Sequence, residues 1–280
     1  MAIISFWGAK KGECGKSSAI AAIATFLGIN HNYKILIIDT KYNDFFYQDC
    51  FWRENKGIKP GINNYTGVGE GISGLSRAIL SNKISPEIIT NYTKIVFNDN
   101  RLELLTDANV LKEEYNMHQN IFKDIAKTAN RFYDLVFVDI DSDLTESAKD
   151  SLLEISDIVV ACMPQNIRSI NSYISSRAQK QFLQNKLVLP LIGRYDVNSK
   201  YNQKNITKYI KEKRDMLIIP YNTLFMEACN EAKLPDFFIK LKGVNSKGKS
   251  KNDDNSMFIY SILDCTDKLI YYLKEAQMRV

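Results

Sequence analysis

Short apolar runs alternate along the chain with longer stretches of helical periodicity. The runs are continuous and rich in β-branched residues, as expected of strands that are buried on both faces of a parallel sheet. They predict strands at residues 3–7, 34–38, 102–105, 134–138, 158–162, 187–192 and 216–219. The periodic stretches predict helices at residues 16–27, 111–130, 145–155, 168–184, 202–213 and 257–277. This order, without internal repeats, predicts an α/β fold with a doubly wound, mostly parallel sheet flanked by helices, whose ligands bind at the carboxyl ends of the strands.

Two segments interrupt the alternation. Residues 43–71 combine aromatic and polar side chains with several glycines, and their length indicates an insertion, either a lid or contact surface or a packed surface excursion. Residues 243–255 are polar and contain glycine, which predicts a mobile loop. The 280 residues otherwise suit a single large α/β domain over residues 1–280.

Composition narrows the class of protein only a little. The five cysteines form no close pairs in the sequence and their number is odd, so we expect a reduced, cytoplasmic protein without disulfides. No apolar run approaches the roughly 18 residues that a membrane-spanning helix needs. The net charge of +5 is modest for this length and by itself identifies no partner.

The first strand leads through a polar loop with Gly12 and Gly15 into a helix that begins near Lys16. Free backbone N–H groups and the positive end of a helix converge in such a loop and bind phosphate. Lys16 is expected to reach the β- and γ-phosphates, and the hydroxyl of Ser17 to bind Mg²⁺. Lys10 stands where the strict phosphate-loop pattern has its first glycine, but the order strand, loop and helix at the start of an α/β chain favours a true phosphate loop.

Two aspartates come directly after apolar runs. Asp39 and Asp139 are therefore expected at the carboxyl ends of strands, where carboxylates orient Mg²⁺ and its waters. Asp141 and Asp143 crowd the same turn as Asp139, so a solvated acidic loop is the alternative. The strand register favours Asp139 as the site residue.

The segment Lys11 to Ser17 reads KGECGKS and resembles the deviant Walker A motif KGGxGK[ST] of the ParA/MinD family of dimerising ATPases. The stretches KILIID, DLVFVD, IGRYD and IPYN, which begin at residues 34, 134, 192 and 219, resemble further motifs of that family, so the resemblance spans most of the chain. It implies ATP and Mg²⁺ as cofactors and an ATP-dependent homodimer in which Lys11 reaches the phosphates of the partner.

The resemblance, together with the chemistry of the loop, assigns residues to three roles. Those expected to contact the nucleotide are Lys11, Gly12, Glu13, Cys14, Gly15, Lys16, Ser17, Ser18, Pro220 and Asn222. Those expected to act in catalysis are Lys11, Lys16 and Asp39. Those expected to hold Mg²⁺ are Ser17, Asp39 and Asp139.

The sequence also departs from the family pattern. Lys41 replaces the aspartate that positions the attacking water, and Asp44 substitutes for it only if the loop bends back. Glu13 replaces a glycine of the loop, and Gly193 stands where the family has an asparagine that contacts adenine. Loss of the water-positioning group slows phosphoryl transfer without abolishing nucleotide binding. We therefore predict ATP binding with slow hydrolysis.

Other features have two interpretations each. Lys200, Lys204, Lys208 and Lys211 lie on or beside one predicted helix and form either a solvated face or a surface for sequence-independent contacts with DNA phosphates. The last helix is amphipathic, but it carries few cations on its polar side, so we expect it to pack on the sheet rather than to bind a membrane surface. Cys14 at a helix start is either a small tolerated side chain or a thiol with a lowered pKa.

Three functions are compatible with these patterns. The first is an ATP-dependent dimeric switch that positions a cargo, such as a plasmid or chromosome, a division component, or pilus or secretion machinery. The second is a pseudo-ATPase scaffold that recruits an unknown protein partner through residues 43–71. The third is a metabolic P-loop enzyme, and the cysteine spacing argues against one that bridges an iron–sulfur cluster between subunits. Lys41 and Glu13 keep the second open beside the first.

Overall fold

The computed structural model describes residues 1–8, 14–52, 71–81, 85–97, 101–107, 110–241 and 253–278. Lys10, Lys11, Gly12 and Glu13, most of the predicted insertion at residues 43–71 and most of the predicted loop at residues 243–255 lie outside these ranges.

A sheet of eight strands in the order β3-β4-β2-β5-β1-β6-β7-β8 runs through the centre of the molecule. The strands are β1 (Ala2–Gly8), β2 (Ile35–Asp39), β3 (Lys94–Phe97), β4 (Leu102–Leu105), β5 (Leu135–Asp139), β6 (Ile158–Met163), β7 (Leu187–Tyr195) and β8 (Leu217–Pro220). All seven strands predicted from the apolar runs are present and pair in parallel. β3, which was not predicted, pairs antiparallel with β4 at one edge. The predicted fold class is confirmed.

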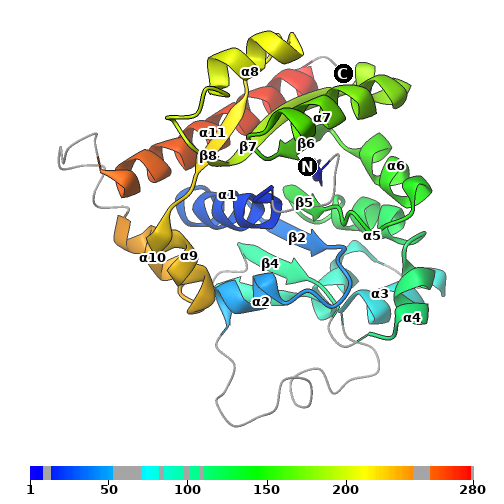
Figure 1. Ribbon diagram of the computed structural model, residues 1–280. Coiled ribbons are helices and arrows are strands. Elements are labelled where there is room, and N and C mark those ends of the chain that lie inside the picture. The colour runs from blue at the N-terminus through cyan, green and yellow to red at the C-terminus, as the bar shows by residue number, and fades with distance from the viewer. Residues whose placement is uncertain are drawn as a thin grey trace.

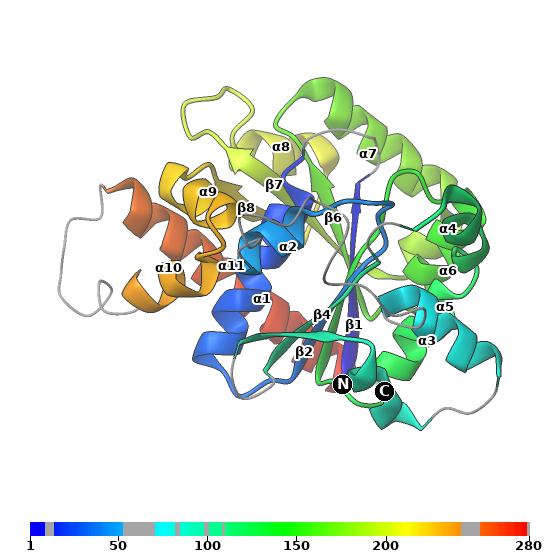
Figure 2. The same cartoon turned by 90° about the horizontal axis from the view of Figure 1, so that it is seen from below.

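Helices cover both faces of this sheet (Figures 1 and 2). One face carries α1 (Lys16–Asn30), α2 (Phe46–Phe51), α9 (Thr223–Asn230), α10 (Leu234–Leu241) and α11 (Asp254–Met278). The other face carries α3 (Gly71–Leu80), α4 (Lys112–His118), α5 (Phe122–Ala129), α6 (Glu146–Ile155), α7 (Ile167–Gln179) and α8 (Gln203–Ile210).

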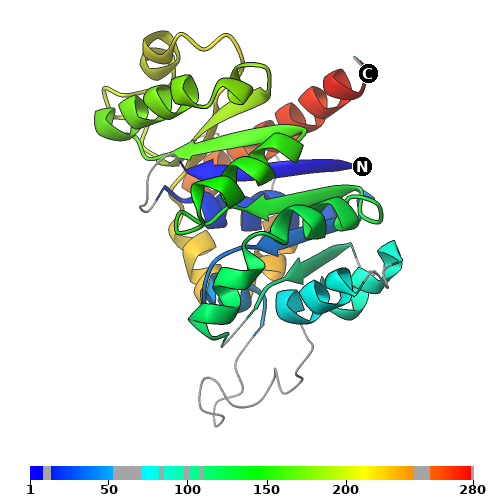
Figure 3. The same cartoon turned by 90° about the vertical axis from the view of Figure 1, so that its right-hand side faces the viewer.

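The two apolar layers explain why the strand signal is continuous. In β1, Ile4 and Phe6 belong to the layer under α1, whereas Ile3 and Trp7 belong to the layer on the opposite side. A strand that is buried on both faces needs apolar residues at successive positions, not at alternate ones. Figure 2 shows the strands between the two layers of helices, and Figure 3 shows that the beginning of β1 and the end of α11 lie at the same end of the molecule.

The helices differ from the prediction mainly in their ends and in the short members. The stretch predicted at residues 111–130 is two helices, α4 and α5, and α8 ends at Ile210 because Lys211 takes a left-handed conformation with φ 53°. The predicted packing of the last helix is confirmed, since Ile262 and Leu269 of α11 are buried in the core. Sequence periodicity did not predict the helices α2, α3, α9 and α10. Each has ten residues or fewer, and a helical repeat is poorly defined over so short a length.

No described helix combines the length and the apolar character that crossing a membrane would require.

Candidate nucleotide-binding site

The loop between β1 and α1 ends at a left-handed glycine. Gly15 has φ 71° and directly precedes Lys16, the first residue of α1. Only glycine adopts this conformation without strain, so the turn into the helix depends on this residue. The hydroxyl of Ser18 donates a 2.9 Å hydrogen bond to the Gly15 carbonyl and closes the first turn.

Gly193 of β7 packs directly against this loop. A Cβ atom at residue 193 would lie 2.2 Å from the Cys14 carbonyl oxygen and 3.3 Å from the Cα atom of Gly15. Backbone atoms cannot move aside as a side chain does, so any larger residue would displace the loop. This contact gives a physical reason for glycine where the ParA/MinD pattern has asparagine.

Asp139, at the end of β5, gathers side chains from three elements. Its Oδ1 atom lies 2.9 Å from Lys16 Nζ, and its Oδ2 atom accepts hydrogen bonds of 2.7 Å from Ser17 Oγ and 2.9 Å from the hydroxyl of Tyr47. Lys16 also donates to the carbonyl of Ile140. Burial alone would raise the pKa of Asp139, but Lys16 and then Lys41 outweigh it and hold the pKa at about 2. The carboxylate is therefore ionised.

Asp39 lies beside Asp139, because β2 and β5 pair in parallel with these two residues in register. Asp39 is fully buried, and within the described part of the chain its Oδ2 atom has no hydrogen-bond partner. Burial, opposed by Lys41, raises the pKa of Asp39 to about 8. The pair expected from the sequence is thus brought together at the carboxyl ends of adjacent strands. Asp141 lies on the following turn and is less buried.

Lys41 points into the same acidic cluster. Its Nζ atom lies 2.9 Å from Asp44 Oδ2, 3.6 Å from Asp139 Oδ2 and 3.7 Å from Asp39 Oδ1. Burial would lower the pKa of Lys41, but the three carboxylates together raise it, so the ammonium stays charged. Asp44 is engaged twice, because its Oδ1 atom accepts from the backbone N–H of Phe46 at the start of α2.

Thr40 and Tyr115 hold together the chain segments that leave the adjacent strands β2 and β5. The Thr40 hydroxyl donates to the Asp139 carbonyl and accepts from the Asp141 N–H, each at 2.8 Å. The Tyr115 hydroxyl donates to the Thr40 carbonyl at 2.9 Å. Sequence analysis identified neither Tyr47 nor Tyr115, and no motif spacing marks them. The only sequence feature noted near Tyr47 is the aromatic and polar composition of residues 43–71.

A pocket of about 420 Å³ opens over these groups. The described residues that line it are Gly8, Cys14, Gly15, Lys16, Ser17, Ser18, Lys41, Asp44, Phe46, Asp141, Ser142, Arg194 and Met226. The lining thus combines the positive helix start, two lysines and the carboxylates of Asp44 and Asp141, and Lys16 is paired with the buried Asp139. This combination suits a phosphate group with a divalent cation.

Two of the predicted nucleotide contacts are absent from the described lining of this pocket and stay predictions. Pro220 and Asn222 are not among the described residues that line the pocket. Asn222 caps α9 instead, because its Oδ1 atom accepts from the Phe225 N–H at 2.8 Å while its Nδ2 atom donates to Asn255 Oδ1 at 2.8 Å. Both ends of the amide are occupied within the fold.

Cys14 is buried, and burial raises the pKa of its thiol against the opposing charge of Lys16. The interpretation of Cys14 as a thiol with a lowered pKa is therefore wrong, because the side chain is enclosed rather than partly exposed. All five cysteines are buried and unpaired.

The donor set at the pocket floor fits Mg²⁺ better than a softer metal. Ser17, Asp39 and Asp139 offer oxygen ligands, which Mg²⁺ prefers, and the buried Oδ2 atom of Asp39 has no hydrogen-bond partner among the residues that the structure describes. Within the part of the chain that the structure describes, no group of three or more His, Cys, Asp or Glu side chains is arranged to hold a metal ion. A magnesium ion here would therefore need oxygen atoms of a bound nucleotide as further ligands.

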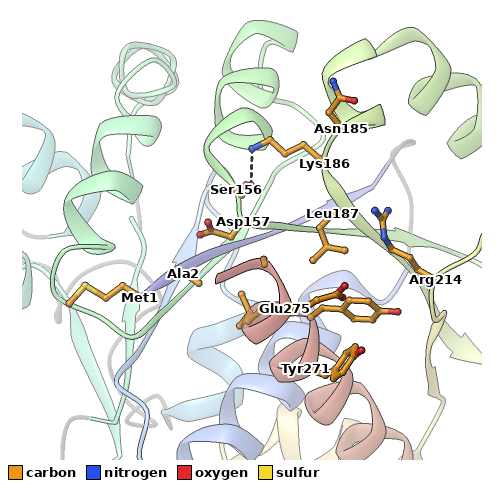
Figure 4. Close-up of a pocket in the computed structure, with 13 residues that line it drawn as sticks. Met1, Ala2, Ser156, Asp157, Asn185, Lys186, Leu187, Arg214, Tyr271 and Glu275 are labelled. Atoms are coloured by element: carbon orange, nitrogen blue, oxygen red, sulfur yellow. Dashed lines mark hydrogen bonds between the residues drawn. The ribbon is translucent and has the colours of Figure 1, made fainter. Parts of the chain in front are cut away.

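A larger pocket of about 620 Å³ lies at the opposite end of the sheet, beside the beginning of β1 (Figure 4). Two of its charged groups are engaged within the fold: Asp157 accepts from the Ile3 N–H at 2.7 Å, and Lys186 donates to the Ser156 carbonyl at 3.0 Å. By volume this pocket would be the better candidate for a ligand site. The smaller pocket is the better candidate by chemistry, because the charged side chains of Lys16, Lys41 and Asp44 line it.

The predicted basic residues lie on the surface. Lys200, Lys204, Lys208 and Lys211 are all exposed, on α8 and in the residues directly beside it. The alternatives of a solvated face and a surface for DNA both remain compatible with this placement.

The fold and the site together define a class. A parallel sheet whose first strand turns through a left-handed glycine into a lysine- and serine-bearing helix, with an acidic strand end alongside, is the architecture of a P-loop nucleoside triphosphatase. No family model matches the chain. No curated protein matches its sequence.

Solved structures give the particular fold. A ParA family ATPase from Chlorobium tepidum has a TM-score of 0.68 at 17% identity, with 95% of this chain and 98% of that chain covered. The cell-division ATPase MinD of Pyrococcus furiosus has a TM-score of 0.66 at 15% identity, with 96% and 100% covered. A putative plasmid partition protein from Borrelia burgdorferi bound to AMPPNP has a TM-score of 0.55 at 19% identity, with 94% and 96% covered. The chain has the fold of the ParA/MinD ATPases, which confirms the resemblance at the level of the fold.

Proposed function

We propose that this protein is an ATP-binding, nucleotide-dependent dimeric switch that positions a cellular cargo and hydrolyses ATP slowly. The cargo class is a plasmid or chromosome, a division component, or pilus or secretion machinery. The observation that carries the proposal is the junction of β1, α1 and β5, where Lys16 lies 2.9 Å from Asp139 under an open pocket. Structural neighbours that partition plasmids or act in cell division support the cargo classes.

The nucleotide phosphates would lie at the start of α1. The helix start provides backbone donors, and the Lys16 ammonium would leave Asp139 to approach the β- and γ-phosphates. Ser17, Asp139 and Asp39 would hold Mg²⁺, which supplies charge neutralisation of the phosphates. One structural neighbour, a MinD from Pyrococcus horikoshii, is a complex with Mg-ADP.

Slow hydrolysis is proposed because of Lys41. An attacking water needs an acceptor aligned with the γ-phosphate, and an ammonium cannot accept its proton. Asp44 carries a carboxylate near the pocket, but that carboxylate pairs with Lys41 at 2.9 Å. The two carboxylates nearest to Lys41, those of Asp44 at 2.9 Å and Asp139 at 3.6 Å, are therefore both paired with a cation in the described structure.

The proposed function also includes a homodimer, a DNA contact and a cellular location. Lys11 is proposed to cross to the partner's phosphates in an ATP-bound homodimer, and the chain is proposed to form one ATPase domain. Lys200, Lys204, Lys208 and Lys211 are proposed as a contact for DNA phosphates, supported by their exposure. A cytoplasmic location is proposed and is supported by five buried, unpaired cysteines.

Calorimetry with ATP and Mg²⁺ tests nucleotide binding at this pocket. Lys16→Ala is expected to weaken binding at least about tenfold, because the ammonium offsets phosphate charge that backbone donors alone do not neutralise. Lys149→Ala is the control, since Lys149 pairs with Glu146 on the surface of α6. Equal affinities of the wild type and Lys16→Ala would remove the phosphate-loop assignment.

A pseudo-ATPase scaffold is the second candidate, and the ion pairs of Lys41 favour it. In that case nucleotide is held without turnover and the cargo is recruited through another surface. A phosphate-release assay, with and without DNA and lipid vesicles, separates the two, because only the switch releases phosphate.

A further inference from the structure

The ammonium of Lys41 lies between the two carboxylates that the magnesium assignment uses, Asp39 and Asp139. It lies nearly equidistant from Asp39 Oδ1 and Asp139 Oδ2, at 3.7 and 3.6 Å. These separations exceed a direct hydrogen bond, so Lys41 acts on both carboxylates through its charge. The same two carboxylates are the ones assigned to the metal.

The Lys41 ammonium offsets negative charge on Asp39 and Asp139 but donates no direct hydrogen bond to either carboxylate. No described residue donates a hydrogen bond to the Oδ2 atom of Asp39, although Asp39 is fully buried. A buried carboxylate oxygen without a partner is costly, and a hydrated divalent ion would satisfy it. A divalent ion and an ammonium cannot share this space at low cost, because like charges a few ångström apart repel strongly where water is excluded.

Asp44 gives Lys41 a second anchor. The direct contact of 2.9 Å is to Asp44 Oδ2, at the rim of the pocket, and the Asp44 side chain is 36% exposed. Lys41 can therefore swing from the buried pair toward solvent while it keeps this partner.

We propose that Lys41 is a tethered cation that competes with Mg²⁺ for Asp39 and Asp139, so that it sets the metal requirement of nucleotide binding. Without metal, Lys41 and Lys16 together supply the positive charge that the phosphates need. With metal, Lys41 must be displaced toward Asp44. This inference rests on the proposed nucleotide site and goes further, because it makes nucleotide binding weakly dependent on Mg²⁺.

The test measures binding of AMPPNP by calorimetry, in EDTA and across a titration with MgCl₂. Lys41→Met is expected to weaken binding in EDTA and to lower the Mg²⁺ concentration for half-saturation, each by at least about tenfold, because charge support is lost while competition is removed. Opposite changes in the two conditions distinguish competition from damage to the fold, which would weaken binding in both. Thermal melting of each variant confirms that it is folded.

Three further variants sharpen the result. Lys41→Arg keeps the charge and is expected to behave nearly as the wild type does. Asp44→Asn keeps the acceptor for the Phe46 N–H but removes the outer anchor, so it is expected to raise the Mg²⁺ concentration required. Lys149→Met is the matched control, because the Lys149 side chain is 12% exposed and that of Lys41 is 13% exposed.

The outcomes are distinct. If the wild type binds AMPPNP and its Mg²⁺ titration superimposes on that of Lys41→Met, the competition is wrong and the nucleotide site stands. If the wild type binds no AMPPNP with or without Mg²⁺, the proposed function itself is wrong and the inference falls with it.

Discussion

The hydroxyl of Tyr47 donates a 2.9 Å hydrogen bond to Asp139 Oδ2, and both residues are fully buried. Tyr47 belongs to α2, the helix that follows β2, and Asp139 lies at the end of β5. The bond therefore connects α2 to the carboxylate that pairs with Lys16. The charge network of the pocket floor therefore includes α2.

Removing this hydroxyl should destabilise the fold. Tyr47→Phe keeps the ring but takes one donor from an ionised, buried acceptor, which costs about 1.5–3 kcal/mol on the usual scale of bonds to charged groups. Urea unfolding followed by circular dichroism measures the change. Tyr260→Phe on the exposed side of α11 is the control and should change the free energy of unfolding by less than about 0.5 kcal/mol. Equal stabilities of Tyr47→Phe and the wild type would show that the bond contributes nothing.

A methyl group at residue 193 should damage the phosphate loop. Gly193→Ala places a Cβ atom 2.2 Å from the Cys14 carbonyl, and the resulting backbone shift is expected to cost about 1–3 kcal/mol and to weaken ATP binding. Gly28→Ala is the matched control, since the nearest atoms to its Cβ would belong to side chains away from the loop, Phe97 Cζ at 2.7 Å, Phe97 Cε2 at 3.3 Å and Leu102 Cβ at 3.6 Å. Calorimetry with ATP should separate the two variants. Unchanged affinity in Gly193→Ala would mean that the loop tolerates the displacement.

Placing a carboxylate at residue 41 should raise turnover. Lys41→Asp restores the residue type that positions water, and hydrolysis is expected to increase about 10- to 100-fold, up to the lower end of the range for one general acid–base group. A phosphate-release assay measures the rate. Lys41→Met separates two causes: an equal increase in Lys41→Met would assign the effect to removal of the ammonium and not to gain of a carboxylate. No increase in either variant, against brisk turnover by the wild type, would mean that another group such as Asp44 aligns the water.

Dimerisation should require Lys11. Light scattering with a non-hydrolysable ATP analogue is expected to show a dimer for the wild type and a monomer for Lys11→Ala, because the proposed lysine contact crosses to the partner's phosphates. Lys10→Ala, one residue earlier, is the control and should still dimerise. A wild-type protein that stays monomeric in every nucleotide state would favour the scaffold.

The sequence by itself determined the sheet and the residues at its strand ends. Apolar runs at successive positions identified seven strands, because burial on both faces leaves no polar alternation to confuse the pattern. Asp39 and Asp139 were then placed together without coordinates, since the carboxyl ends of parallel strands meet at one edge of a sheet. Lys16 and Ser17 were predicted as site residues because they begin the helix after the loop that follows the first strand.

Only the tertiary structure decided which side chains touch at that edge. Tyr47 reaches Asp139 across 92 positions of the chain, Gly193 meets Cys14, and Asn222 caps α9 instead of facing the pocket. Lys41, which the sequence marks only as a missing carboxylate, proves to be a cation bound among three acids. Such contacts depend on loop paths and side-chain directions, and these are set by packing between distant elements, which the spacing of residues along one chain does not encode.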